Sequence, residues 1–273
     1  MALKVESLKK NYNHFIKDKN LLDDLVNEAI FGYSEIKDFI KNNNVKSLLE
    51  IGCGTGILLN ELKKEFPLIK MIGLEPMKSG YEKYKDMKIL NSFSNFEIIE
   101  NDIENLSINL KFDLIFSVNV LEHVNNWQKY LLKSSKYLDI GGTNIVLCPN
   151  YDFPYESHYT IPIIFNKRIT KIFFNKHILR HEHKNNIIGH WEDLNFISKK
   201  RLKQFLEKKQ FNYYFDEKIS DRIFNRLTYD MALKKRHGLI GYLALFFKKL
   251  YIDKLLFVLF KVPFPYLKLI IKN

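Results

Sequence analysis

The sequence predicts an α/β fold in which helices cover a doubly wound parallel sheet. Along residues 45–150, short apolar runs alternate with segments whose apolar residues recur every three or four positions, and a glycine cluster separates the first run from the first such segment. Strands buried on both faces give apolar runs, whereas covering helices give the wider spacing. The chain has 273 residues, of which 46% are hydrophobic, so it can bury a large core.

The N-terminal segment, residues 1–44, is expected to consist of amphipathic helices, because apolar residues between 19 and 43 mostly recur three or four positions apart. Residues 45–150 then form the expected α/β core, with a turn at Gly141-Gly142 before its last strand. The expected strands are SLLEI, MIGLEP, NFEIIEND, FDLIFSVNV and TNIVLCP, and the expected helices are ILLNELKKEF and residues 126–138.

The alternation breaks at residues 151–195, which are rich in aromatic, histidine and basic residues, and we expect a lid insertion there. Residues 196–237 are expected to close the core with a helix, KKRLKQFLEKKQ, capped by Ser198, and with two strands, FNYYFDEKI and roughly RLTYDMALKK. The final segment, 238–273, is expected to be a basic, apolar, helical tail. Charged residues interrupt it, so no run of about 18 apolar residues remains to span a membrane.

The chain is basic, because 43 Lys and Arg residues oppose 31 Asp and Glu residues and give a formal net charge of +12. This charge favours an anionic partner, and nucleic acid, acidic lipid and anionic metabolites all fit it. Cys53 and Cys148 are too few for a disulfide framework or a cysteine-rich zinc site, and they suit a reducing compartment. The polar N-terminus lacks the apolar run of a secretory signal, so we expect a cytoplasmic protein.

The strongest chemical signal is the loop Glu50-Ile51-Gly52-Cys53-Gly54-Thr55-Gly56 between the first strand and the first helix of the core. Glycines at alternate positions expose backbone on which a ligand can rest, at the strand end where open α/β sheets bind ligands. The spacing differs from the dinucleotide loop G-x-G-x-x-G and from the phosphate loop G-x-x-x-x-G-K-[ST]. Glu50 disfavours a phosphate there and suits a ligand with a cationic ammonium group.

Two further carboxylates lie at expected strand ends. Glu75 closes the second strand, where it can accept hydrogen bonds from both hydroxyls of a ribose. Asp102 closes the third strand, where it can accept a hydrogen bond from the amine of adenine, with Ile103 beside the ring. Together with Glu50 these acids would span a nucleoside. The alternative is that all three are solvated loop acids, which is common for any one of them.

The chain resembles the class I S-adenosylmethionine-dependent methyltransferases over residues 45–150 and, more weakly, over 190–233. LLEIGCGTG resembles the first motif of the family. GLEP, which contains Glu75 and Pro76, resembles its ribose-binding turn, and ENDI resembles its adenine-contacting position. FDLIFSVNVLEHV, DIGGTNIVLCPN and GHWEDLNFISKKRLKQFLEKKQF are similar to the ubiquinone-biosynthesis O-methyltransferase subgroup. The resemblance implies S-adenosylmethionine as cofactor, contacted also by Cys53 and Asn119. It further implies a Rossmann-like, seven-stranded, mostly parallel sheet with an antiparallel last strand.

One position departs from this resemblance. Some quinone O-methyltransferases carry Glu-x-x-Glu-His at the fourth strand, where the acids and the histidine support a divalent metal, whereas this chain has Asn119-Val120-Leu121-Glu122-His123. A hard cation prefers several oxygen ligands, so loss of the first carboxylate weakens the case for a metal. We therefore expect that no metal is required.

Two histidines are candidates for the catalytic base that removes a proton from a hydroxyl acceptor. His123 follows the fourth strand and His190 lies near the end of the expected lid, and an imidazole titrates near neutral pH. Such a base typically accelerates the reaction by about 10²–10⁴-fold. The alternative for His123 is a structural role, in which it caps or packs the helix that it enters.

The expected lid carries two more sets of residues. His177, His181 and His183 are close in sequence, but Lys and Arg crowd them, so we expect a solvated basic surface rather than a metal site. The aromatic side chains could line an acceptor pocket, although we expect most of them to form a small core of the lid; they are Tyr151, Phe153, Tyr155, Tyr159, Phe165 and Trp191.

The sequence thus predicts a methyltransferase that acts on an oxygen of a small molecule, a glycan or a lipid-linked precursor. The basic, apolar residues within 163–273 could also contact an acidic membrane surface, or the tail could pack on its own domain or on a partner subunit. A nucleic-acid methyltransferase is the less favoured alternative, motivated by the net charge. A nucleoside-binding or scaffold protein without turnover is the other.

Overall fold

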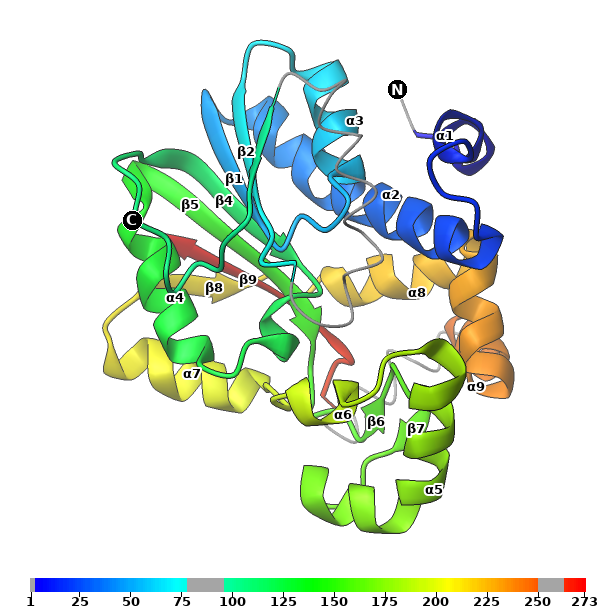
Figure 1. Cartoon of the computed structure of the whole chain (residues 1–273). Coiled ribbons are helices and arrows are strands. Elements are labelled where there is room, and N and C mark those ends of the chain that lie inside the picture. The colour runs from blue at the N-terminus through cyan, green and yellow to red at the C-terminus, as the bar shows by residue number, and fades with distance from the viewer. Residues whose placement is uncertain (1–2, 78–95, 250–262) are drawn as a thin grey trace. The chain divides into compact units, whose positions relative to one another are not determined.

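The structure, a computed structural model, describes residues 3–77, 96–249 and 263–273 (Figure 1). A seven-stranded sheet has the order β3-β2-β1-β4-β5-β9-β8, and β6 pairs with β7 in a separate two-stranded sheet. The strands are β1 (Ser47–Ile51), β2 (Lys70–Leu74), β3 (Glu97–Ile99), β4 (Phe112–Val118), β5 (Leu138–Pro149), β6 (Tyr155–Glu156), β7 (Ile161–Pro162), β8 (Asn212–Phe215) and β9 (Tyr266–Lys272). The helices are α1 (Val5–Tyr12), α2 (Lys19–Asn42), α3 (Ile57–Glu65), the 3-10 helix η2 (Leu121–His123), α4 (Trp127–Lys136), α5 (Lys167–Asn185), α6 (His190–Asp193), α7 (Lys199–Lys208), α8 (Ile219–Tyr229) and α9 (Met231–Lys249).

The first five strands of the seven-stranded sheet are parallel. β1 pairs in parallel with β2 and β4, and β2 pairs in parallel with β3. β4 and β5 are joined by two backbone hydrogen bonds. Phe112 N donates to Tyr137 O where both strands begin, and Asn119 N donates to Leu147 O where both end, so the two strands run in parallel. β1 is buried from its second residue onward, as its apolar run predicts. The predicted Rossmann-like α/β fold is confirmed.

β9 runs antiparallel to β5. Asn150 N donates to Pro265 O, so the end of β5 lies beside the start of β9. Asn273 N donates to Gly142 O, so the end of β9 lies beside the first part of β5. The resemblance implies such an antiparallel strand, but the sequence pattern places a helical tail over these residues, and that prediction is wrong for residues 266–272. A short apolar run does not distinguish a helix from a strand, and burial of β9 from Tyr266 to Ile271 decides for a strand.

Two further element predictions are wrong. RLTYDMALKK forms parts of α8 and α9 instead of a closing strand: Ile219 and Leu227 bury one face of α8, and Arg226 Nε donates to Asp230 Oδ2 at 2.8 Å. The Gly141-Gly142 pair lies inside β5, where Gly141 adopts a φ of +76°, rather than in a turn before the strand. Among the helices that the structure describes, none is long and apolar enough to cross a bilayer.

The chain divides into two compact units, and their boundary passes through β5 and β9. The first unit comprises residues 1–118, 129–145 and 271–273, and the second comprises residues 119–128 and 146–270. The first therefore contains the glycine loop with its neighbouring acids, and the second contains the candidate histidines. The finer five-part division expected from the sequence stays a prediction.

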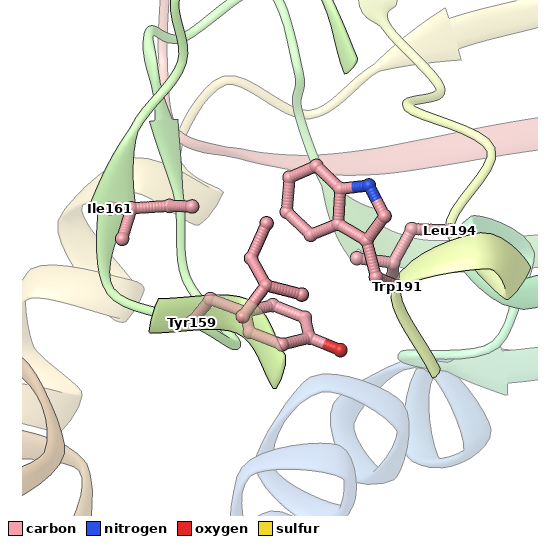
Figure 2. Packing of buried hydrophobic residues seen from close by; sticks show 5 residues of the cluster. Tyr159, Ile161, Trp191 and Leu194 are labelled. Atoms are coloured by element: carbon pink, nitrogen blue, oxygen red, sulfur yellow. The ribbon is translucent and has the colours of Figure 1, made fainter. Parts of the chain in front are cut away.

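A small apolar cluster organises part of the second unit (Figure 2). It consists of buried side chains from β7, α5, α6 and the adjoining loops, namely Tyr159, Ile161, Ile178, Trp191 and Leu194. The rings of Tyr159 and Trp191 meet edge to face with centroids 5.2 Å apart. Phe165, in contrast, is 91% exposed, so it belongs to no core. The predicted Ser198 cap is confirmed, since its hydroxyl accepts from Arg201 N at 3.3 Å.

Because Trp191 is buried and Phe165 is exposed, we expect their replacement by alanine to affect stability unequally. Trp191→Ala empties a fully buried site and should lower the free energy of unfolding by about 3–5 kcal/mol. Phe165→Ala is the matched control and should change it by less than about 0.5 kcal/mol, because the ring is exposed. Urea unfolding followed by circular dichroism measures both values. Equal losses in the two variants would contradict the cluster as described.

Candidate functional site

The glycine loop connects β1 to α3 (Figure 1), and its three glycines have left-handed backbone conformations. Their φ angles are +71° at Gly52, +52° at Gly54 and +78° at Gly56, which residues with a Cβ disfavour. The N–H groups of Gly52 and Cys53 donate to Leu74 O and join the loop to the end of β2. Apart from Gly54 and its two chain neighbours, no heavy atom of the described residues lies within 4 Å of the place where a Cβ would stand on Gly54, so this side of the loop is open.

Glu75 connects the end of β2 to the same loop. Its Oε2 accepts a hydrogen bond from Gly54 N at 2.9 Å, and its Oε1 accepts one from Met77 N at 3.3 Å. Burial raises the pKa of this carboxyl, while the two backbone donors act in the opposite direction. Pro76 follows at the turn out of the strand. The geometry therefore places a carboxylate directly against the open backbone of the loop.

Glu50 lies at the end of β1 and is almost fully buried, with 4% of its surface exposed. Its Oε2 has no hydrogen-bond partner in the described part of the chain. Burial raises the pKa of Glu50 well above its usual value, and the nearby carboxylates of Glu28 and Glu75 raise it further. A buried carboxylate whose Oε2 lacks a donor and that lies near other acids fits a cationic ligand group, which would supply both charge and donors.

Cys53 and the Asp102-Ile103 pair complete the predicted cofactor residues of the first unit. The Cys53 thiol is buried against Gly73, where a Cβ would come within 2.6 Å of its sulfur, and burial raises its pKa. Asp102 follows β3, and its Oδ1 accepts from Asn105 N and Nδ2 at 3.0 and 2.7 Å, which closes a local turn. Ile103 is buried beside it. Their contacts with a cofactor stay predictions.

Asn119 is the first residue of the second unit. It has a φ of +55°, and its N donates to Leu147 O at 2.9 Å. Its side-chain Oδ1 accepts from the Tyr266 hydroxyl at 2.6 Å. Asparagine tolerates the left-handed conformation better than glutamate does, so the backbone gives a physical reason for the residue that departs from Glu-x-x-Glu-His.

The second unit brings His123 and His190 together with a third histidine, His158. The ring centroids are 5.2 Å apart for His123 and His158, 4.9 Å for His123 and His190, and 5.4 Å for His158 and His190. We call these three residues the histidine cluster. Sequence reasoning missed His158, because nothing but the short spacing Glu156-Ser157-His158 marks it within an aromatic-rich segment.

Glu156 orients one member of the histidine cluster. Its Oε1 lies 2.6 Å from His158 Nδ1, and it also accepts from the Tyr151 hydroxyl at 3.2 Å. Its Oε2 accepts from Tyr159 N at 2.6 Å. The Glu156 side chain is fully buried. Although burial acts to raise its pKa, His158 and the backbone donors lower it overall, so Glu156 is a charged partner for His158.

The three imidazoles differ in basicity because only one has such a partner. Burial, together with the neighbouring histidines, lowers the pKa of His123 well below its usual value and that of His190 to about 4. Burial also acts to lower the pKa of His158, but Glu156, with a smaller contribution from Glu122, outweighs it, and the net shift is upward. Of the three imidazoles, His158 is therefore the one that binds a proton most readily.

Glu182 positions His190 from the other side. Its Oε1 accepts from the Tyr159 hydroxyl and from Trp191 N, both at 2.8 Å, and its Oε2 accepts from Gly189 N at 3.1 Å. The Tyr159 hydroxyl in turn lies 3.3 Å from His190 Nδ1. Sequence reasoning missed Glu182 as well, because its role depends on contacts between α5 and the start of α6 that no local pattern reveals.

One group of side chains has the composition of a cation site. Ligand atoms of Glu122, His123 and His158 lie within 4.8 Å of one another in the described part of the chain. His158 Nδ1 lies 2.6 Å from Glu156 Oε1, and metal-binding histidines commonly have such a carboxylate partner on the other ring nitrogen. The absence of a metal requirement, expected from the sequence, stays a prediction. His177, another histidine considered from the sequence, instead lies with Nε2 3.0 Å from Tyr159 O.

The chain matches the methyltransferase domain family over residues 14–214, and therefore belongs to that family. The resemblance to class I S-adenosylmethionine-dependent methyltransferases is confirmed. An uncharacterised protein of Mycobacterium tuberculosis is 32% identical over 127 residues, which cover 45% of this chain and 43% of the relative. The malonyl-[acyl-carrier protein] O-methyltransferase 1 of Ilyobacter polytropus is 29% identical over 134 residues, which cover 49% and 46% respectively. The chain thus spans less than half the length of these curated relatives.

Solved structures share the fold. The O-methyltransferase from a trans-AT PKS multienzyme of Brevibacillus brevis, in complex with S-adenosyl-L-homocysteine, has a TM-score of 0.52 at 15% identity, with 96% of this chain and 79% of that chain covered. The plantazolicin methyltransferase BpumL, in complex with a pentazolic desmethylPZN analogue and SAH, has a TM-score of 0.51 at 16% identity, with 98% and 90% covered. At these identities the likeness concerns the fold alone.

The buried acid of the glycine loop predicts a pH-dependent cost in stability. A carboxyl whose folded pKa is raised destabilises the fold as pH rises above its unfolded value of 4.5. Glu50→Gln removes this charge and should raise the free energy of unfolding at pH 7 by about 1–3 kcal/mol, with a smaller gain at pH 4. Urea unfolding at both pH values measures it.

The matched control is Glu97→Gln, which alters an exposed acid at the start of β3. It should leave stability unchanged at both pH values. A Glu50→Gln variant that is less stable than the parent at pH 7 would show that the buried carboxylate is stabilised in the free protein.

Proposed function

We propose that the protein is an S-adenosylmethionine-dependent methyltransferase that methylates an oxygen of a small-molecule, glycan or lipid-linked acceptor. The observation that carries the proposal is Glu50, a buried carboxylate without a donor for its Oε2, next to three left-handed glycines. Membership of the methyltransferase domain family supports it. The names of relatives include O-methyltransferases, among them the one from Ilyobacter polytropus, which supports oxygen as the acceptor atom.

The loop and its acids fit this cofactor. Glu50 suits the ammonium of its methionine part, because an ion pair with added donors would satisfy a carboxylate that burial and two acids leave disfavoured. The bare backbone of Gly52, Gly54 and Gly56 lets the chain approach the ligand closely. A phosphate would meet repulsion from Glu50 and Glu75, so a nucleoside without phosphate is the ligand that the charges favour.

Glu75 and Asp102 are proposed to hold the nucleoside. The Glu75 carboxylate is held at the edge of the loop by Gly54 N and could accept from ribose hydroxyls with its remaining lone pairs. Asp102 and Ile103 are proposed to contact the adenine, with Cys53, Pro76 and Asn119 completing the binding residues. The cofactor, when bound, supplies a methyl group activated on a sulfonium.

The histidine cluster is proposed to remove the proton of the acceptor hydroxyl. The methyl group leaves sulfur with its bond electrons remaining on sulfur, the acceptor oxygen forms the new bond, and one proton must depart. A catalytic base works best when its pKa is near the working pH. Burial makes His123 and His190 weak bases, whereas Glu156 increases the basicity of His158, so His158 is the stronger candidate and the other two would position it and the acceptor.

Calorimetry tests the cofactor assignment. Glu75→Ala should weaken S-adenosylmethionine binding by about 10- to 150-fold, the loss expected for charge-assisted hydrogen bonds worth about 1.5–3 kcal/mol. Glu97→Ala, at an exposed acid at the start of β3, should bind like the parent. Parent protein that binds no S-adenosylmethionine would refute the proposal. Binding without methyl transfer to any fractionated lysate component would favour a scaffold protein instead.

A pH profile tests the role of the histidine cluster. His158→Gln should lower kcat/KM by about 10²–10⁴-fold. Glu156→Gln removes the anion that raises the pKa of His158, so the acidic limb of the kcat/KM profile should move to lower pH. His14→Gln, at an exposed histidine, should change neither quantity. An acidic limb that stays in place in Glu156→Gln would exclude His158 as the base.

A further inference from the structure

Large apolar side chains are exposed along α5 and its two flanking loops. Phe165 is 91% exposed, Ile172 and Phe173 are each 71% exposed, and Ile188 is 70% exposed. We call these residues, together with Leu179 and the cations of α5, the α5 surface. Isolated exposed apolar residues are common, but four such residues within 24 positions of one unit indicate a binding surface.

α5 is kinked at Phe174, and exposed residues recur at helical spacing on each side of the kink. Arg168 and Ile172 are four positions apart before the kink, and Lys176, Leu179 and His183 are three or four positions apart after it; all five are exposed. The buried residues of the same helix are Thr170, Ile178 and Glu182. Ile178 packs into the apolar cluster, so the core side of α5 is already occupied and the exposed side chains have no role in it.

The turn before α5 holds Phe165 in a strained backbone conformation with its ring exposed. This residue has a φ of +56°, a conformation that costs a bulky side chain about 1–2 kcal/mol. Polar contacts on both sides maintain the turn: Asn166 Oδ1 caps α5 by accepting from Ile169 N, and the Thr170 hydroxyl accepts from Ile164 N. The backbone is therefore fixed while the ring remains outside the core.

Cations surround the apolar side chains. Arg168, Lys176, Arg180 and Lys184 are exposed on α5. Lys167 and Lys171 contact the Glu192 carboxylate, and the one acid of α5, Glu182, is 4% exposed and engaged by Tyr159 and Trp191. The exposed side of α5 is therefore positive, with apolar groups among the cations.

Exposed apolar side chains among cations favour an anionic lipid surface as the partner of the α5 surface. A symmetric contact with a second copy would bring these cations against one another, which costs association energy. Nucleic acid would use the cations but would leave exposed Ile172 and Phe173 without a function. A bilayer with acidic lipids satisfies both, because phosphates meet the cations and the headgroup region receives the apolar side chains.

We propose that the α5 surface docks the protein on an anionic phospholipid bilayer, with Phe165, Ile172 and Phe173 entering the headgroup region. Docking adds to the proposed function by giving access to a lipid-linked acceptor. It does not depend on methyl transfer, because the residues involved belong to neither the glycine loop nor the histidine cluster.

Vesicle co-sedimentation of the full chain tests the docking. The protein should bind phosphatidylcholine vesicles that contain phosphatidylserine, and binding should weaken as salt increases. Ile172→Ser/Phe173→Ser should weaken binding by at least about tenfold, since each side chain loses its apolar burial. Lys176→Gln/Arg180→Gln should weaken it by about 25-fold, at about fivefold per cation.

Two controls make the assignment specific to the α5 surface. Ile140→Ser alters an apolar side chain that is 97% exposed in β5, and Lys200→Gln/Lys208→Gln removes two exposed cations of α7. Both should bind vesicles like the parent. Retained S-adenosylmethionine affinity in the α5 variants shows that they are folded, and loss of that affinity in the parent would affect the proposed function but leave the docking result intact.

Three outcomes would overturn the docking proposal. The first is no vesicle binding by the parent protein, including the case in which sedimentation velocity shows a dimer that Ile172→Ser/Phe173→Ser dissociates. The second is equal binding to pure phosphatidylcholine vesicles, which would remove the role of charge. The third is parent-like binding by both α5 variants, which would move the contact elsewhere on the chain.

Discussion

The hydrogen bond from Gly54 N to the Glu75 carboxylate is the interaction on which the glycine loop depends. It joins the loop after β1 to the end of β2, beside the bonds that Gly52 and Cys53 make to Leu74 O. The three glycines of the loop have left-handed backbone conformations, and these hydrogen bonds hold the loop in one conformation. The loop is thus shaped before any ligand arrives, which reduces the ordering cost of binding.

Glu50 and Glu75 are similarly buried but differ in what surrounds them. Glu75 accepts from two backbone donors, which offset much of its desolvation, whereas Glu50 Oε2 has no partner in the described residues. The backbone donors therefore offset part of the cost of burying the Glu75 carboxylate, whereas the buried Glu50 carboxylate weakens the fold of the free protein. A cationic ligand would stabilise the Glu50 carboxylate, so the free energy that this buried charge costs the free protein would be recovered on binding.

The sequence predicts the parts of the fold that local patterns determine. The alternation of strands and helices, the glycine loop and the Ser198 cap depend on residues close together in the chain, and the structure contains all of them. β9 and the helical form of RLTYDMALKK depend on which surface buries an ambiguous apolar run, and no local pattern contains that information. His158 and Glu182 were missed for the same reason, since their partners Glu122, His190 and Tyr159 come from different elements.

Three neighbouring imidazoles do not provide three bases. A proton on one imidazole raises the electrostatic cost of a proton on the next, and burial adds to that cost, so a cluster of this kind accepts no more than about one proton. Glu156 determines where the charge resides, because its own anionic form is stabilised by backbone donors and it contacts His158 directly. Methyl transfer from a sulfonium to a hydroxyl releases one proton per turnover. The capacity of the cluster for a single proton therefore matches the stoichiometry of that reaction, and the two neutral neighbours remain available as hydrogen-bonding groups.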